Sequence, residues 1–236
     1  MSDMLIEAAD GGSFSAYVAR PRQGAYAGES TGAVVLIQEI FGVNQAMRDA
    51  ADWVADLGFV AVCPDLFWRI RPGVDLTDKT QAEWQEAFAL MNAFDQDKGV
   101  EDIIATLAAA RWISGGNGRA GTLGYCLGGR LAVMTALRAD ADVNISYYGG
   151  GLDQFAGELD RVSKPLLLHV AEKDEFFPAE GRARLLAAAQ GNAAIHAWTY
   201  PDADHAFARV GGTHWQGRAA AIANGRSAEA LVQALG

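Results

Sequence analysis

The sequence predicts a single α/β domain with a mainly parallel central sheet and helices on both faces. Short apolar runs alternate with longer stretches of helical period along the chain. Several runs are apolar at nearly every position, which is typical of strands covered on both faces, and the repeated strand-then-helix order implies right-handed crossovers. The length of 236 residues suits one α/β domain, so we expect residues 1–236 to fold as one unit.

The elements are expected in the following order. Residues 5–20 place two strand-like runs around Asp10, Gly11 and Gly12, a pattern that predicts a hairpin. Six further strands then alternate with six helices. The strands are expected at 33–38, 59–63, 120–125, 143–148, 165–171 and 194–200, and the helices near 45–57, 81–92, 97–113, 128–138, 179–189 and 213–234.

Two segments interrupt this alternation. Residues 24–32 are rich in Gly, Ala and Ser, and we expect them to form a surface loop. Residues 66–97 are the least regular part of the chain and follow the end of a predicted strand, where ligands bind in open α/β sheets. We therefore expect the second segment to form a lid, a pocket wall or a surface loop without a role in the site.

The charge balance and the absence of apolar spans exclude several functional classes. The chain carries 29 acidic and 19 basic residues, a formal net charge of −10, whereas nucleic-acid binding usually needs a basic stripe. No apolar run approaches the ~18–20 residues that span a bilayer, and the first residues do not resemble a signal peptide. We therefore expect a cytoplasmic protein that binds neither nucleic acid nor membranes and is a monomer or a weak homodimer.

We expect no cofactor and no metal. The two cysteines, Cys63 and Cys126, are too far apart in sequence for a metal knuckle and do not form a disulfide framework. There is no phosphate-binding loop, and residues 124–129 lack the glycine spacing of a dinucleotide site. Catalysis, if present, would therefore depend on side chains alone.

The strongest local signal is residues 124–129 (GYCLGG), between a predicted strand and a predicted helix. Glycines on both sides of Cys126 allow the chain to double back, so the central side chain projects at the helix N-terminus. The helix dipole there favours a thiolate. The sequence therefore predicts a cysteine nucleophile; the alternative is a buried structural cysteine beside glycines that pack the helix.

Two loops downstream supply partners for this thiol. The predicted strand 165–171 is followed by Asp174, and the predicted strand 194–200 is followed by His205. Both loops lie at the sheet edge where Cys126 is presented, and hydrolases on such sheets carry nucleophile, acid and histidine in this order. We therefore expect a catalytic triad of Cys126, His205 and Asp174.

Other residues are weaker candidates for the roles of nucleophile, base and acid. Glu172 and Glu175 flank Asp174 and remain alternatives to it as the acid. The other histidines and the second cysteine are expected to be packing or surface residues: His169 and Cys63 in the core, His196 and His214 without a catalytic setting.

Residues 38–44 (QEIFGVN) follow the predicted strand 33–38. This position supplies an oxyanion-hole amide in hydrolases of this architecture, so we expect the N–H groups of Ile40 and Leu127 to be the two donors. Glu39 is unusual there, because a carboxylate near a thiol suppresses the thiolate. We expect Arg209 to neutralise it; the alternative is that Glu39 is a loop carboxylate without a role.

These residues together resemble the dienelactone hydrolases (carboxymethylenebutenolidases), a cysteine branch of the α/β-hydrolase fold. The resemblance covers nearly the whole chain with matching order and spacing. It rests on residues 38–44 (QEIFGVN), 63–66 (CPDL), 124–129 (GYCLGG), 147–149 (YYG), Asp174 and 205–209 (HAFAR).

The resemblance implies a mechanism in which Cys126 is the nucleophile, His205 the base and Asp174 its orienter. It also implies that Glu39 restrains the resting thiol or helps to activate it. In the family scheme the substrate carboxylate engages Arg209 and frees Glu39, which then takes the thiol proton.

The remaining steps follow from the same resemblance. The thiolate attacks a lactone or ester carbonyl, and the Leu127 and Ile40 amides stabilise the oxyanion. Water then releases the acyl group from the enzyme. Phe41 and Tyr147 are implied as further substrate contacts.

The sequence departs from the family pattern at one position. The family grips the substrate carboxylate with two arginines; Arg209 preserves one, but Trp84 stands where the second is expected. Losing one arm of such a clamp costs about 1.5–3 kcal/mol. Arg69 or Arg71 is a possible replacement, and Trp84 either packs on its helix face or indicates a bulkier, more aromatic substrate.

The sequence thus predicts a cysteine-dependent hydrolase that opens lactones or cleaves small carboxylic esters through an acyl-enzyme. The alternative is a non-catalytic ligand-binding protein that retains a hydrolase scaffold. A thiol redox sensor at Cys126 is a weaker alternative, since no resolving cysteine lies nearby in sequence.

Overall fold

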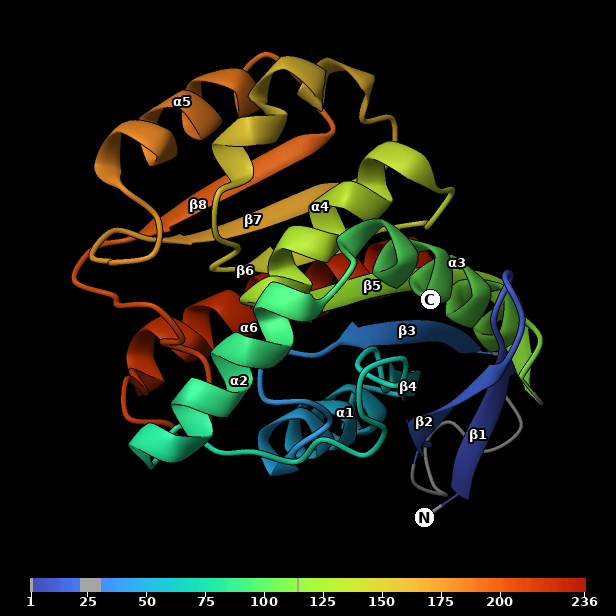
Figure 1. Ribbon diagram of the computed structural model, residues 1–236. Helices are drawn as coiled ribbons and strands as arrows, with labels where there is room; N and C mark the ends of the chain where they lie inside the picture. The colour runs from blue at the N-terminus through green and yellow to red at the C-terminus, as the bar shows by residue number, and fades with distance from the viewer. Residues whose placement is uncertain (1, 22–30, 114) are drawn as a thin grey trace.

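The computed structural model describes residues 2–21, 31–113 and 115–236. Within them, eight strands join in one sheet in the order β1-β2-β4-β3-β5-β6-β7-β8 (Figure 1). The pairs β1–β2 and β2–β4 are antiparallel and all others are parallel, so the predicted hairpin and the mainly parallel sheet are confirmed. The strands are β1 (Ser2–Glu7), β2 (Ser13–Ala19), β3 (Thr31–Ile37), β4 (Val60–Pro64), β5 (Gly116–Tyr125), β6 (Asn144–Tyr147), β7 (Leu166–Ala171) and β8 (Ile195–Tyr200).

Helices cover both faces of this sheet, as predicted. One face is packed by α3 and α4, and the opposite face by α1 and α6 (Figure 1). The helices are α1 (Gln45–Asp56), α2 (Gln81–Ala93), α3 (Gln96–Arg111), α4 (Leu127–Arg138), α5 (Ala179–Ala189) and α6 (Gly217–Leu235), with a 3₁₀ helix η1 (Leu152–Arg161).

Several observed boundaries differ from the predicted ones; β5, for example, begins at Gly116 and not at residue 120. The 3₁₀ helix η1 was not expected: it follows Gly151 at φ +62°, and short 3₁₀ helices lack the 3.6-residue period on which the prediction relied. The last helix begins at Gly217 rather than near 213, because the Gln216 N–H bonds the Phe207 carbonyl (2.9 Å) and holds the preceding residues in a loop. Most of the loop expected at 24–32 lies outside the described residues, and its last two residues begin β3.

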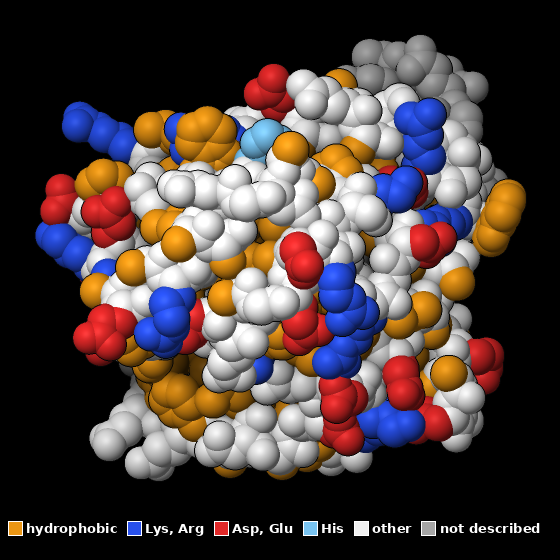
Figure 2. Space-filling model, turned by 90° about the horizontal axis from the view of Figure 1, so that it is seen from above, with side chains coloured by type: hydrophobic (Ala, Val, Ile, Leu, Met, Phe, Trp, Pro, Cys, Tyr) orange, Lys and Arg blue, Asp and Glu red, His pale blue; other side chains and the backbone are white. Residues whose placement is uncertain are grey.

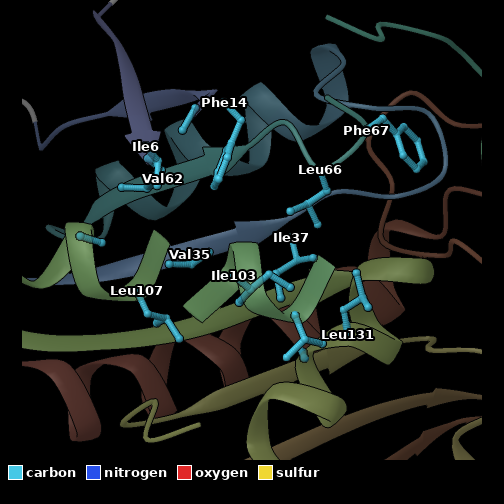
Figure 3. Packing of buried hydrophobic residues seen from close by; sticks show 14 of the residues in the cluster. Ile6, Phe14, Val35, Ile37, Val62, Leu66, Phe67, Ile103, Leu107 and Leu131 are labelled. Carbon is cyan, nitrogen blue, oxygen red and sulfur yellow. The ribbon is translucent and has the colours of Figure 1, made fainter. Parts of the chain in front are cut away.

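The continuous apolar pattern of β3 divides between two cores. Val35 and Ile37 face a cluster that includes Ile103 of α3, whereas Val34 and Leu36 face the cluster under α1 and α6. Figure 3 shows the first cluster, in which side chains of the sheet meet those of α3 and α4. Successive side chains of a strand point to opposite faces, so a strand buried on both must be apolar throughout. These two cores fix the carboxyl ends of the strands, where the site lies.

The surface carries charges of both signs. On the face drawn in Figure 2, acidic and basic side chains are interspersed. Elsewhere in the structure, charged side chains form ion pairs, among them Arg111 with Asp140 at 3.0 Å. Within the described part of the chain, no helix is both long and apolar enough to cross a bilayer.

Candidate active site

Cys126 lies in a sharp turn between β5 and α4. Its backbone adopts φ +55°, a conformation that costs a non-glycine residue about 1–3 kcal/mol. The glycines around it are required for close approach: a Cβ on Gly124 would lie 2.0 Å from the Gly128 carbonyl oxygen, and one on Gly128 would lie 2.2 Å from that of Ile37. The predicted strand–turn–helix elbow is therefore confirmed, and it presents Cys126 at the N-terminus of α4.

His205 and Asp174 meet at the same edge of the sheet. His205 follows β8 and Asp174 follows β7, and the imidazole Nδ1 lies 2.8 Å from Asp174 Oδ2. The other oxygen, Oδ1, accepts a hydrogen bond from the Phe176 N–H at 2.8 Å, so the carboxylate is held on both sides. Glu172 and Glu175, by contrast, are exposed. Of the three acidic candidates, the structure brings Asp174 to the histidine.

The proton affinity of His205 depends on Cys126 and Asp174. Burial lowers the pKa of the imidazole, but the attraction of an ionised Cys126 and the Asp174 carboxylate together outweigh it and raise the pKa to about 10. The rings of Tyr148 and Phe176 pack edge-on against the imidazole, with centroids 5.2 and 4.9 Å away. The geometry therefore favours the protonated imidazole at His205, and a cation beside a cysteine is one of the settings that activate it.

A buried ion-pair cluster lies beside this pair. Arg209 donates from Nε and Nη2 to the two oxygens of Glu39 (2.6 and 3.0 Å), and from Nη1 to Asp78 Oδ2 (2.8 Å). The expected pairing of Glu39 with Arg209 is therefore present. Burial raises the pKa of Asp78, but the Thr213 N–H and the guanidinium outweigh it and hold this pKa below its ordinary value. Two carboxylates thus share one arginine.

Asp78 is a member of the site that the sequence did not indicate. It lies in the irregular segment between β4 and α2, where no motif marks it, and it meets Arg209 from 131 residues away. Its backbone carbonyl also accepts a hydrogen bond from Trp84 Nε1 at 3.0 Å. Asp78 therefore connects the loop after β8 to the start of α2.

A cavity of about 270 Å³ opens at Cys126. Six other residues predicted for the site also contact it: His205, Ile40, Leu127, Phe41, Trp84 and Arg209. The rest of its lining is mostly apolar, with one further arginine: Phe88, Met91, Phe176, Gly150, Gln96 and Arg130.

The irregular segment contributes a wall of this cavity. Trp84 and Phe88 of α2 line it, and the Trp84 ring meets Phe41 edge-on at 4.9 Å. Neither proposed substitute for the missing arginine is there: Arg69 pairs with Asp102 and Asp10, and Arg71 with Glu86. Trp84 therefore presents an aromatic surface where the family pattern has a cation.

The two expected oxyanion donors also lie at this cavity. Leu127 is the first residue of α4, and the first hydrogen bond of that turn runs from the Arg130 N–H to the Cys126 carbonyl (3.1 Å). The N–H of Leu127 is thus one of the unpaired amides at a helix N-terminus. Ile40 lines the cavity from the loop after β3. This placement agrees with a shared oxyanion hole.

The structure does not bring Tyr147 to the cavity. Its side chain is fully buried on the α6 face of the sheet, where the hydroxyl bonds Asn224 (2.9 Å) and Ser227 (2.7 Å). Its expected contact with substrate therefore has no support in this geometry. The next residue, Tyr148, turns to the His205 side at φ +37°.

His169 and Cys63 are core packing residues, as expected, and His196 and His214 are exposed. His169 is buried, with Nδ1 2.8 Å from the Tyr200 hydroxyl and Nε2 2.9 Å from that of Ser227. Burial lowers its pKa to about 3, so it stays neutral. Cys63 is fully buried, and burial raises the pKa of its thiol. Neither side chain lines the cavity at Cys126.

The sheet order, the elbow and the Asp174–His205 pair on the loops after β7 and β8 define an α/β-hydrolase. A family model described as the dienelactone hydrolase family matches residues 14–235. The chain belongs to the dienelactone hydrolase family, and it is a hydrolase.

Similar proteins cover the chain almost completely. A protein of Azospirillum brasilense, provisionally named a carboxymethylenebutenolidase, is 54% identical over 100% of both chains. The carboxymethylenebutenolidase of Pseudomonas putida is 37% identical over 96% of this chain and 94% of its own. A crystal structure from Klebsiella pneumoniae, provisionally described as a dienelactone hydrolase, superposes with a TM-score of 0.85 at 23% identity, covering 98% of each chain. This similarity to the Klebsiella pneumoniae structure supports the fold alone.

Proposed function

We propose that this protein hydrolyses lactones or small carboxylic esters through a Cys126–His205–Asp174 triad and a thioester acyl-enzyme. The observation that carries the proposal is the convergence of the three groups on one edge of the sheet. Cys126 and His205 line the same cavity, and Asp174 holds His205 at 2.8 Å. Family membership supports the reaction class.

The chemistry follows from these positions. The Cys126 thiolate attacks the ester or lactone carbonyl carbon, and the Leu127 and Ile40 amides stabilise the oxyanion. As the tetrahedral intermediate collapses, the C–O bond to the alkoxide breaks, and the His205 imidazolium protonates this leaving group. His205 then takes a proton from water, the hydroxide attacks the thioester, and the thiolate leaves with the carboxylic acid as product.

Glu39 and Arg209 regulate the thiol in this proposal. The carboxylate opposes ionisation of a nearby thiol, and Arg209 holds it in place with two hydrogen bonds. Displacement of Arg209 from Glu39 as substrate enters the cavity frees Glu39 to accept the thiol proton. Asp78 retains its own bond to Arg209 and keeps the guanidinium anchored while this exchange occurs.

The substitution Glu39→Gln is expected to raise, by about three- to tenfold, the rate at which iodoacetamide alkylates Cys126 at pH 7. The amide removes a negative charge near the thiol, while Asp78 keeps Arg209 in place. Mass spectrometry of the alkylated peptide gives the rate. Glu86→Gln, which removes an exposed carboxylate of α2, is the control and should leave the rate unchanged. An unchanged rate in the Glu39 variant would contradict a restraining role.

The direct test follows the hydrolysis of a dienelactone and of a neutral aryl ester by ultraviolet absorbance. Samples quenched with acid during turnover are examined by mass spectrometry. We expect hydrolysis of substrate together with a protein species heavier by the acyl group, which is carried on the peptide that contains Cys126. Turnover of the neutral ester alone supports the triad and indicates that Trp84 has reshaped the pocket. Binding without turnover of either compound would support a ligand-binding protein instead.

A further inference from the structure

A second arginine lines the catalytic cavity. Arg130 lies in the first turn of α4, four residues after Cys126, and its N–H donates to the Cys126 carbonyl at 3.1 Å. Both side chains line the same cavity, with Arg130 on the side of η1 and the start of α3.

The guanidinium of Arg130 is fixed by neutral partners. Nε donates to the Gln96 side chain (2.8 Å), Nη1 to the Gly151 carbonyl (2.9 Å) and Nη2 to the Gln154 side chain (2.9 Å). The ring of Phe155 lies under it, 4.8 Å from its carbon. These contacts hold the charge in one orientation before a ligand arrives, which lowers the entropy cost of binding.

The two arginines of the cavity differ in their charge balance. Arg209 is bonded to two carboxylates, Glu39 and Asp78, so that cluster carries one negative charge in excess. Arg130 forms no ion pair with any residue that the structure describes, and the carboxylate of its neighbour Asp153 is engaged by Arg184. Burial lowers the pKa of Arg130, and attraction to Asp153 offsets part of this. The uncompensated positive charge of the cavity is at Arg130.

We propose that Arg130 binds an anionic group on the acyl part of the substrate, and that the enzyme prefers monoesters of short dicarboxylic acids over uncharged esters of equal length. This proposal rests on the proposed function, because it assigns specificity to the same site. The apolar wall of Trp84, Phe88 and Met91 holds the methylene chain, and the free carboxylate accepts a hydrogen bond from the Nη2 hydrogen that Gln154 leaves free.

The test compares two substrates that differ in one group. In the 4-nitrophenyl monoester of adipic acid a terminal carboxylate replaces the terminal methyl group of 4-nitrophenyl hexanoate. We expect kcat/KM of the native protein to be higher for the adipate monoester, after subtraction of spontaneous hydrolysis. Arg130→Gln should lower it about 10- to 100-fold more for the adipate monoester than for the hexanoate. Arg130→Lys should restore part of the preference.

A matched control separates this role from a structural one. Arg138→Gln removes a charge from the same helix, where the side chain is exposed and paired with Asp97. This variant should leave kcat/KM unchanged for both esters. The ratio of kcat/KM for the adipate monoester to kcat/KM for the hexanoate should also fall as the salt concentration rises. An equal loss of both activities in Arg130→Gln, or no loss of either, would overturn the proposal.

The outcomes also distinguish this proposal from the one on which it rests. If the native protein hydrolyses hexanoate but shows no preference for adipate, Arg130 has no role in specificity and the triad stands. If the native protein hydrolyses neither ester and forms no acyl-enzyme, the proposed function fails, and the specificity proposal fails with it.

Discussion

The substitution Cys126→Ala is expected to lower kcat/KM for ester hydrolysis about 10⁴- to 10⁶-fold, because removing a triad nucleophile leaves only binding and the oxyanion hole. The fold should survive, since the side chain is partly exposed at a turn and alanine is smaller. The measurement is ultraviolet-monitored hydrolysis of the neutral aryl ester by both proteins. The acyl-enzyme species should also disappear from the mass spectrum of the variant.

The second cysteine provides the matched control. Cys63→Ala removes a thiol of the same type that is fully buried in β4 and away from the cavity. Its activity should remain within about twofold, although the free energy of unfolding falls by about 1 kcal/mol for the lost buried group. Full activity in Cys126→Ala, or equal losses in the two variants, would show that Cys126 is not the nucleophile.

Replacing Asp174→Asn is expected to lower kcat about 10⁴-fold, because an amide in this position favours the wrong imidazole tautomer. The carboxylate also raises the pKa of His205, which stands at about 10 against the opposing effect of burial. Loss of that charge should lower this pKa, so the imidazolium gives up its proton at a lower pH than in the native protein. Nuclear magnetic resonance of the imidazole against pH reports the shift.

The two neighbouring glutamates test the assignment of the acid. Glu172→Gln and Glu175→Gln each remove a carboxylate from the same loop, but both side chains are exposed. Each variant should retain activity within about twofold and leave the His205 titration in place. A loss in either one comparable to that of Asp174→Asn would reassign the orienting carboxylate.

Much of the fold and part of the site could be predicted because local signals are strong there. Continuous apolar runs mark the parallel strands, and glycines around Cys126 mark a turn that no larger residue allows. The pairing of Glu39 with Arg209 followed from charge: a carboxylate near a thiol needs a compensating cation. The first two signals lie in short stretches of adjacent residues, whereas the pair of Glu39 and Arg209 joins residues 170 apart in sequence.

The remaining features depend on contacts that local sequence does not encode. Asp78 reaches Arg209 from an irregular segment, and Arg130 faces the cavity because η1 supplies its neutral partners. The place of Tyr147 also depends on such contacts. The sequence did not show that β6 ends at Tyr147 or that its hydroxyl bonds Ser227 of α6, away from the cavity.

The backbone at Cys126 also implies a trade-off between activity and thermal robustness. The turn holds a side chain at φ +55°, where glycine would be unstrained, so the protein gives up about 1–3 kcal/mol of folding free energy at this position. Cys126→Gly should therefore denature in urea at a concentration no lower than the native protein does, while lacking all thiol chemistry. At this position an inactive variant would be at least as stable as the active protein, so the residue serves the reaction at a cost in folding free energy.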